Sequence, residues 1–463
     1  MENKKTDFSE WYNEIIDIAR LSDKRYLIKG MNVWLPYGLK IMHSIDNLLR
    51  DYSEESGIEE VSFPVLISRE QLEVEFEHVK GFENEIYWVT KGGTDPLDID
   101  LALRPTSEAA MYTMFPLWIR SHTDLPFRIY QIVSVYRYET KHTRSFIRVR
   151  EIHFYEAHTA HKDFEDAEKQ MEDYIEIMDK LSDDLCINFS MDIRPDWDKF
   201  PGAMYSVAFD TPMPGSRSLQ IGTIHEYGEN FAKNYEIKYL DDEGNMKYVS
   251  QTTFGLSERL LAAVIGIHGD DKGLVLPYKL APVQVIIVPI SGNGYDNIIK
   301  YSEETMETLK SMGIRCQIDE RDYTPGYKYN DWEMKGVPVR IEIGKREVDD
   351  GTLTLSMRTR KNKIKISGDE LKNIYNYLQE VNSDIKKQAS EFYNDNVAFI
   401  ENMDYIKEDK MVTAYWCGRK ECSDKIEAVS EKTALGTVRN SDKSGKCIVC
   451  GRPGKISAFS RTY

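Results

Sequence analysis

Two neighbouring segments with strand-like patterning constrain the fold of this chain more than any other feature. Residues 127–139 are rich in β-branched and aromatic side chains without helical spacing, which predicts a long strand. Residues 146–156 alternate in a similar way, and the polar, basic loop 140–145 separates the two segments. Because residues two apart share one face of a strand, we expect Arg137 and Glu139 to project together. The sequence therefore predicts an antiparallel hairpin on which cationic groups and a carboxylate converge.

Two interpretations of this hairpin are open. Arginines on the covered side of a sheet need anions, and local glutamates would satisfy them without any function. Alternatively, the arginines hold an anionic ligand. The hairpin alone favours neither interpretation.

Composition narrows the class of protein. A chain of 463 residues with 41% hydrophobic residues is large enough for two to four domains. Its formal net charge of −17 argues against nucleic-acid binding through bulk charge, so any such contact must use local basic patches. The longest apolar runs, residues 260–267 and 283–290, are far shorter than the roughly 20 residues that span a membrane. Since residues 1–10 also lack a signal-peptide pattern, we expect a cytoplasmic protein with no membrane segment.

Changes in pattern divide the chain into three predicted domains. Residues 1–281 mix amphipathic helices with alternating strands, and the two prolines in Leu276–Pro282 indicate a linker. Residues 282–382 alternate strand and helix, as in a βαβ domain. Residues 383–463 form a charged, cysteine-rich tail. We therefore expect an α+β protein of three domains.

Three motifs together resemble class II aminoacyl-tRNA synthetases. The hairpin, with Arg-x-Glu followed by a loop and Arg150-x-x-x-Phe154, resembles motif 2. Residues 57–64 are similar to motif 1, which ends in proline and helps to form the dimer interface in that class. Residues 254–263 resemble motif 3, in which a glycine leads into a helix that carries an arginine, here Arg259. A helix N-terminus beside an arginine suits phosphate, although a simple packed helix is equally common.

Within this class, the residues are most similar to the prolyl-tRNA synthetase family. The string Leu103–Glu108 resembles the Thr-x-Glu loop that holds the secondary ammonium of proline, although it also fits a helix N-cap. Further matches are Lys199–Ala203, Gln220–His225 and Asp331–Pro338, and the similarity extends from about Phe8 to Tyr463. The resemblance implies an antiparallel-sheet catalytic domain, an α/β anticodon-binding domain and a small α/β zinc-binding C-terminal domain. It also implies a homodimer that joins L-proline to tRNA-Pro with ATP and Mg²⁺.

The resemblance assigns a role to each matching residue. Arg137 and Arg259 are the expected catalytic residues. The expected proline-binding residues are Thr106, Glu108, Arg137, Phe154, Phe200 and His225. The expected ATP-binding residues are Arg137, Glu139, Arg148, Val149, Gln220, Thr223, Ser257 and Arg259. An aromatic slot excludes alanine poorly, because lost apolar contact is worth only about 1–3 kcal/mol, so mischarging with alanine or cysteine is expected.

Two features depart from other family members. Many prolyl enzymes have phenylalanine where this chain has Ile152, so an aliphatic contact would replace a stack on adenine. Only about one hundred residues separate Phe154 from Gly255, too few for the large editing insertion of the bacterial form. The resemblance is therefore to the archaeal or eukaryotic type. A threonyl enzyme, or a paralogue that binds RNA without catalysis, remains the alternative.

The middle domain and the tail carry the remaining predicted sites. Arg321, Lys328 and Glu333 are expected near the anticodon of tRNA-Pro, although a purely structural loop is equally compatible. The two short cysteine pairs fit a closed, structural Zn²⁺ site, with redox pairs or idle thiols as the alternative. The expected zinc ligands are Cys417, Cys422, Cys447 and Cys450. The lone Cys186 and Cys316 are expected to be buried thiols.

Overall fold

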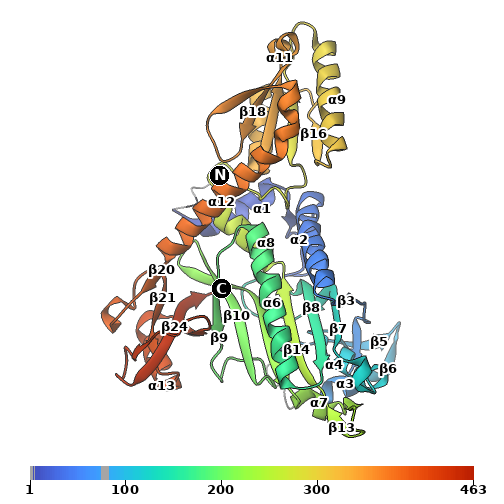
Figure 1. Ribbon diagram of the computed structural model, residues 1–463, viewed down its shortest axis with the longest axis vertical. Coiled ribbons are helices and arrows are strands. Elements are labelled where there is room, and N and C mark those ends of the chain that lie inside the picture. The colour runs from blue at the N-terminus through green and yellow to red at the C-terminus, as the bar shows by residue number, and fades with distance from the viewer. Residues whose placement is uncertain (1–3, 5, 75–82) are drawn as a thin grey trace.

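The computed structural model describes residue 4 and residues 6–74 and 83–463, and it arranges them in three parts (Figure 1). A large N-terminal part contains the predicted hairpin, an α/β part follows it, and a smaller C-terminal part ends the chain. One sheet of twelve strands runs through both the first and the last part, whereas the middle part has its own five-stranded sheet. In the described ranges, no helix is both long enough and apolar enough to cross a membrane.

The large sheet is mostly antiparallel. In spatial order its strands are β3 (Glu59–Glu60), β7 (Phe127–Tyr136), β8 (Glu151–His161), β14 (Ser250–Ser257), β11 (Arg217–Gly228), β10 (Tyr205–Met213), β9 (Ser190–Ile193), β22 (Thr433–Val438), β24 (Pro453–Thr462), β21 (Met411–Trp416) and β20 (Val397–Phe399). A further strand, β23 (Ser444–Lys446), pairs with β24. The expected antiparallel catalytic sheet is therefore present.

Amphipathic helices pack with this sheet into one large core. They are α1 (Phe8–Ile18), α2 (Pro36–Glu55), α6 (Phe164–Leu185) and α8 (Arg259–His268). Helix α6, for example, buries Met171, Tyr174, Met178 and Leu181, whose three-four spacing forms one apolar stripe. The Asp163 side chain caps its first turn by accepting from the Asp166 N–H at 2.8 Å. Helices α6 and α8 lie across the sheet in Figure 1.

The predicted hairpin forms, but its first strand ends three residues earlier than the pattern predicts, and its second strand begins five residues later. Strands β7 and β8 pair directly, yet Arg137, Glu139 and Arg148 lie in the connection between them and not on strand faces. In this connection Phe146 adopts a left-handed φ of 63° and is buried, with its ring 4.7 Å from that of Trp34. Burial of this aromatic side chain bends the connection and breaks the expected alternation.

Short elements complete the first part of the chain. A three-stranded sheet consists of β4 (Leu66–Ser68), β5 (Tyr87–Gly92) and β6 (Asp95–Leu103). Two hairpin-like pairs are β1 (Ser22–Asp23) with β2 (Val33–Trp34) and β12 (Lys238–Leu240) with β13 (Met246–Tyr248). The short helices are α3 (Arg69–Glu73), α4 (Glu108–Tyr112), α5 (Phe115–Trp118) and α7 (Asn230–Asn234).

The middle part is an α/β domain, as predicted. Its strands, in spatial order, are β16 (Cys316–Ile318), β15 (Val285–Pro289), β17 (Val339–Ile343), β18 (Thr352–Met357) and β19 (Lys363–Ser367). Its helices are α9 (Tyr295–Ser311), α10 (Pro325–Met334), α11 (Lys345–Asp350) and the long α12 (Ile374–Asn396). The predicted linker contains no helix or strand, but Leu276, Leu280 and Ala281 are buried, so it is packed against the core.

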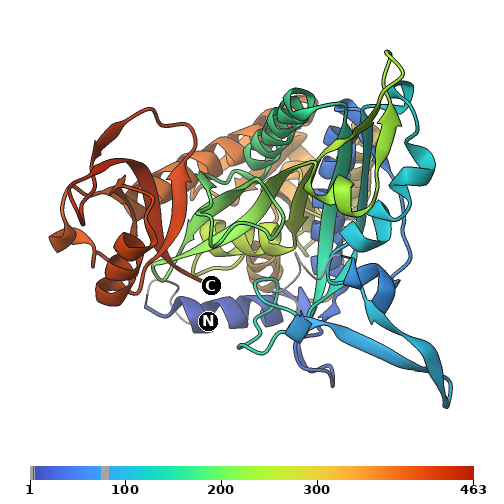
Figure 2. The same ribbon diagram turned by 90° about the horizontal axis from the view of Figure 1, so that it is seen from below.

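The C-terminal part shares the large sheet with the first part. Helix α12 leads into it, and α13 (Lys420–Ser430) packs on β22. Strand β22 pairs with β9, and β24 runs parallel to the start of β11. Figure 2 shows the C-terminal strands, in red, beside the green strands of the first part. This continuity was not evident from the sequence.

Candidate active site

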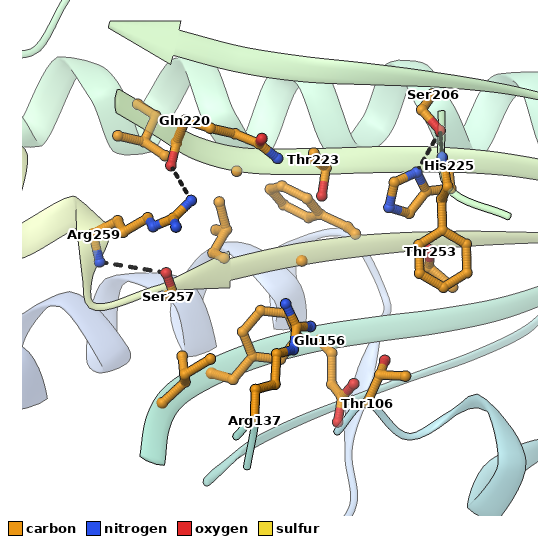
Figure 3. A pocket seen from close by; sticks show the side chains of 18 of the residues that line it. Thr106, Arg137, Glu156, Ser206, Gln220, Thr223, His225, Thr253, Ser257 and Arg259 are labelled. Atoms are coloured by element: carbon orange, nitrogen blue, oxygen red, sulfur yellow. Dashed lines mark hydrogen bonds between the residues drawn. The ribbon is translucent and has the colours of Figure 1, made fainter. Parts of the chain in front are cut away.

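A cavity of about 490 Å³ opens against the sheet where β8, β11 and β14 lie side by side. All of the residues predicted to bind proline or ATP line this cavity: Thr106, Glu108, Arg137, Glu139, Arg148, Val149, Phe154, Phe200, Gln220, Thr223, His225, Ser257 and Arg259. They come from positions up to about 150 residues apart, and Figure 3 shows several of them facing one another. Ile152 lines the same cavity.

One end of the cavity is rich in hydrogen-bond acceptors. Glu108, the first residue of α4, is buried and accepts from the hydroxyl groups of Thr106 and Tyr227, the latter at 3.1 Å. Each carboxylate oxygen thus has one protein donor and retains a free lone pair. A ligand cation with two N–H donors would be well matched by this arrangement.

A second buried carboxylate supports this end of the cavity. Glu156 accepts from the Ser107 hydroxyl, from Gln131 Nε2 at 2.8 Å, and lies 3.4 Å from His158 Nε2. These donors lie on β7, β8 and the segment before α4, so the network ties three elements together. The sequence analysis did not assign a role to Glu156, and the alternating pattern of its strand did not indicate this network.

Aromatic rings form the middle of the cavity. The Phe200 and His225 rings lie 4.8 Å apart, and Phe154 approaches Gly255, where an added Cβ would lie 3.0 Å from the Phe154 ring. His225 Nδ1 is 2.7 Å from the Ser206 hydroxyl (Figure 3). Burial, with the charges of His158 and Arg194, lowers the pKa of His225 to about 3. The imidazole is therefore neutral at physiological pH and closes an apolar slot.

The other end of the cavity is cationic. Burial, with the charges of Arg148 and Arg137, lowers the pKa of Arg259 to about 10. Arg259 Nε donates to the Ile147 carbonyl at 2.9 Å, and Nη1 donates to the Gln220 carbonyl at 3.3 Å (Figure 3). Such a group of guanidinium ions repels itself, so this end is suited to a polyanion.

Arg148 connects the cationic end to the end of the chain. Its Nη1 donates to Glu139 at 2.9 Å, and its Nη2 donates to the main-chain oxygen of Tyr463 at 2.7 Å. The Tyr463 ring lies beside Arg144 and Arg217, with guanidinium carbons 5.9 and 5.8 Å from its centroid. Tyr463 thus reaches the large N-terminal part.

The structure brings the four clustered cysteines of the C-terminal part together. One sulfur atom from each of Cys417, Cys422, Cys447 and Cys450 lies within 4.8 Å of the others. Cys417 Sγ is 3.7 Å from the sulfurs of both Cys422 and Cys450. A tetrahedron with Zn–S bonds of about 2.3 Å has edges of about 3.8 Å, so this group fits Zn²⁺. As expected, the separate Cys186 and Cys316 are buried thiols.

The predicted anticodon residues differ in accessibility. Arg321 is partly exposed and pairs with Asp319 and Asp331, each at 2.7 Å. The Lys328 ammonium is buried and donates to the Asp319 carbonyl at 2.9 Å, so in this structure it fixes the loop and is not presented to a base. Glu333 instead lines a second cavity of about 240 Å³ together with six basic residues: Lys272, Arg340, Arg358, Arg360, Lys361 and Lys363.

Comparisons with known proteins agree with this architecture. Residues 87–268 match the family described as the tRNA synthetase class II core domain (G, H, P, S and T). Residues 284–379 match an anticodon binding domain, and residues 399–463 match the prolyl-tRNA synthetase C-terminal domain. The fold and the cavity thus define a class II aminoacyl-tRNA synthetase.

Similarity over the whole chain identifies the family. The proline–tRNA ligase of Picrophilus torridus is 64% identical, and the match covers 100% of both chains. The Giardia lamblia prolyl-tRNA synthetase in complex with prolyl-adenylate superposes with a TM-score of 0.97 at 34% identity, covering 100% of this chain and 99% of that one. The Cryptosporidium parvum enzyme, complexed with halofuginone and AMPPNP, gives 0.95 at 32% identity, with 100% and 97% covered. The chain belongs to the proline–tRNA ligase family.

Proposed function

We propose that this protein activates L-proline with ATP, forming prolyl-adenylate and pyrophosphate, and then transfers the prolyl group to the 3′ end of tRNA-Pro. The observation that carries the proposal is a single cavity whose wall combines buried acceptors, an aromatic slot and guanidinium groups. An amino acid with an apolar ring and a nucleoside triphosphate together match these acceptors, aromatic rings and guanidinium groups. A threonine substrate would leave its hydroxyl against the aromatic slot.

The acceptor end binds the proline ammonium. Glu108 and Thr106 receive its two N–H groups, and Phe154, Phe200 and His225 enclose the pyrrolidine ring. A neutral His225 is consistent with this role, because a charged imidazole would lose favourable solvation beside an apolar ring.

The cationic end positions ATP. The proline carboxylate attacks the α-phosphorus in line while pyrophosphate leaves, so no protein nucleophile is required. Arg137 stabilises charge on the α-phosphoryl oxygens, and Arg148 and Arg259 neutralise the outer phosphates. Glu139 accepts from the adenine amine. The remaining assigned residues, Val149, Gln220, Thr223 and Ser257, contact the nucleotide.

Magnesium accompanies ATP in this proposal. The cavity wall offers hard oxygen ligands from Gln220, Thr223 and Glu258, and Glu258 Oε2 is buried without a hydrogen-bond partner among the described residues. When bound, the ion would neutralise phosphate charge.

tRNA-Pro contacts the middle domain. Proline anticodons share two guanines, and guanidinium groups bond guanine edges and phosphates readily. Arg321, Glu333 and the basic second cavity are the accessible candidates for this contact. Tyr323 and Tyr327, half exposed with ring centroids 4.5 Å apart, are available to stack on unpaired bases.

Zinc stabilises the C-terminal domain. Four thiolates leave no position for water, so the ion at Cys417, Cys422, Cys447 and Cys450 would be structural. We retain the domain ranges 1–281, 282–382 and 383–463 as working boundaries.

The protein works as a cytoplasmic homodimer in this proposal. Exposed apolar side chains near the motif-1 segment, Val65, Leu66, Leu117 and Trp118, support a partner surface there. Proofreading in cis is not expected, because residues 162–249 build α6, α7 and the strands β9 to β13. Sedimentation and deacylation of alanyl-tRNA-Pro test these two points.

Amino-acid-dependent ATP–pyrophosphate exchange tests the central proposal. Screened over all twenty amino acids, exchange should respond to proline most strongly. Exchange driven by threonine would overturn the specificity, and no exchange with any amino acid would favour a paralogue without catalysis.

A further inference from the structure

The loop of residues 194–204, between β9 and β10, brings Phe200 to the aromatic slot. Inside the loop, the Phe200 N–H donates to the Ser206 hydroxyl at 3.1 Å, and the Lys199 ammonium donates to the Met204 carbonyl at 3.1 Å. The outer side of the loop contacts the C-terminal domain at two places. None of the residues that make these two contacts with the C-terminal domain was assigned above to bind proline or ATP.

The first contact is made by Arg194, at the start of the loop. Its side chain is only 7% exposed, and its Nη1 donates to the Leu435 carbonyl of β22. Its Nη2 lies 2.9 Å from the buried Asp210 carboxylate and donates to Gln220 Oε1 at 3.3 Å. Arg194 thus links a C-terminal strand to Gln220 in the cavity wall.

The second contact is made by Trp197, in the middle of the loop. Its ring meets the Trp416 ring edge-on, with centroids 5.9 Å apart and planes at 84°. Lys420, from the start of α13, places its ammonium 5.7 Å from the Trp197 ring centroid. Trp416 ends β21 and directly precedes Cys417 of the cysteine cluster. Aromatic edge contacts and cation–π contacts both fix ring position.

We propose that the C-terminal domain positions Phe200 for proline binding, with Trp197 and Arg194 as the positioning residues. This inference rests on the proposed function. Trp197 supports only the segment that carries Phe200, so its loss should weaken proline binding and leave ATP binding unchanged. Arg194 also holds Gln220, so its loss should weaken the binding of both substrates.

Steady-state ATP–pyrophosphate exchange with Trp197→Ala tests the proposal. Loss of the edge contact should raise the KM for proline roughly two- to twelvefold, while the KM for ATP and kcat change less than about twofold. Trp197→Phe should recover most of the affinity. The matched control is Phe399→Ala, which removes an exposed aromatic ring of the same domain that packs on Tyr415 and should leave both KM values unchanged. Equal rises in both KM values, or an unaltered KM for proline, would overturn the proposal.

A second variant and a second readout keep the test decisive. Because Arg194→Met alone strands the buried Asp210 charge and can unfold the chain, Arg194→Met is combined with Asp210→Asn. Amide hydrogen exchange of residues 194–204 should be faster in Trp197→Ala than in wild type, and this measurement needs no activity. If the wild-type protein shows no proline-dependent ATP–pyrophosphate exchange, the proposed function fails. The amide hydrogen-exchange measurement still decides whether the C-terminal domain holds the loop of residues 194–204.

Discussion

Replacing Glu108 by glutamine tests the acceptor end of the cavity most directly. The amide keeps the size of the carboxylate, and its oxygen can still accept from one of the two hydroxyl groups of Thr106 and Tyr227, while its NH₂ group replaces the other oxygen and can donate to the second hydroxyl oxygen. What it removes is the negative charge opposite the proline ammonium. The variant should therefore fold like wild type and fail selectively with proline.

The structure sets the size of this effect. Glu108 is only 3% exposed, so little water can replace the lost charge around a bound ammonium. Truncating one partner of a buried, hydrogen-bonded charge pair costs about 2–5 kcal/mol. The kcat/KM for proline should fall by about 30- to 4000-fold, since each 1.4 kcal/mol is about tenfold. The KM for ATP should remain close to that of wild type, because Arg148 and Arg259, which are proposed to hold the outer phosphates, have other partners than Glu108.

Glu226→Gln is the matched control. Burial raises the pKa of Glu226 to about 8, so at neutral pH this carboxyl group is largely protonated and its amide removes little charge. Both variants are assayed by pyrophosphate exchange and by thermal unfolding. A Glu108→Gln enzyme with kcat/KM for proline within about threefold of the control would refute the assignment of the ammonium site.

Three further predictions concern other parts of the molecule. Arg137→Ala should abolish proline-dependent pyrophosphate exchange while the circular dichroism spectrum stays unchanged. Near-normal exchange would refute the proposed contact of Arg137 with the α-phosphate. Cys422→Ser should release zinc, seen by elemental analysis, and lower the unfolding temperature; full metal content would contradict the Cys₄ site. Burial raises the pKa of Glu258 to about 8, so the folded protein keeps a proton that the unfolded chain loses from about pH 4.5 upward. The free energy of unfolding should therefore fall as the pH rises from about 4.5 to about 8. Relative to wild type, Glu258→Gln should raise the unfolding temperature more at pH 8 than at pH 5, and an equal rise at both pH values would refute this reasoning.

Local hydrophobic patterns predicted the fold class well. The alternating pattern indicated a strand pair near β7 and β8, and the succession of strands and helices indicated the α/β middle domain. Such patterns are visible in the sequence because they reflect which face of each element is buried. The ends of β7 and β8 could not be predicted in this way. Burial of Phe146 against Trp34 decides where the strands stop, and those two residues lie more than one hundred positions apart.

The candidate active site could likewise be predicted only in part from the sequence. Residue types and the family resemblance identified side chains that line one cavity, yet neither indicated the partner that holds each of them. Arg194 and Tyr227 illustrate the difficulty. An arginine before a proline and a tyrosine in a strand carry no distinguishing pattern, and only the pairing of distant strands brings them to Gln220 and Glu108. Lys328 shows the converse, since a lysine suited to guanine by type is buried and donates to the Asp319 carbonyl.

The shared sheet carries one consequence for how this enzyme becomes active. Two arginines of the cavity donate hydrogen bonds to main-chain oxygens of the C-terminal domain. Arg148 donates to Tyr463, and Arg194 donates to Leu435. Both acceptors lie more than 200 residues further along the chain, on or beside strands that pair with β9 and β11. Without them, two largely buried guanidinium groups would lose partners, which is costly. The cavity can therefore reach its final geometry only after β22 and β24 have joined the sheet. The C-terminal domain is in this sense a part of the active site and not an appendage to it.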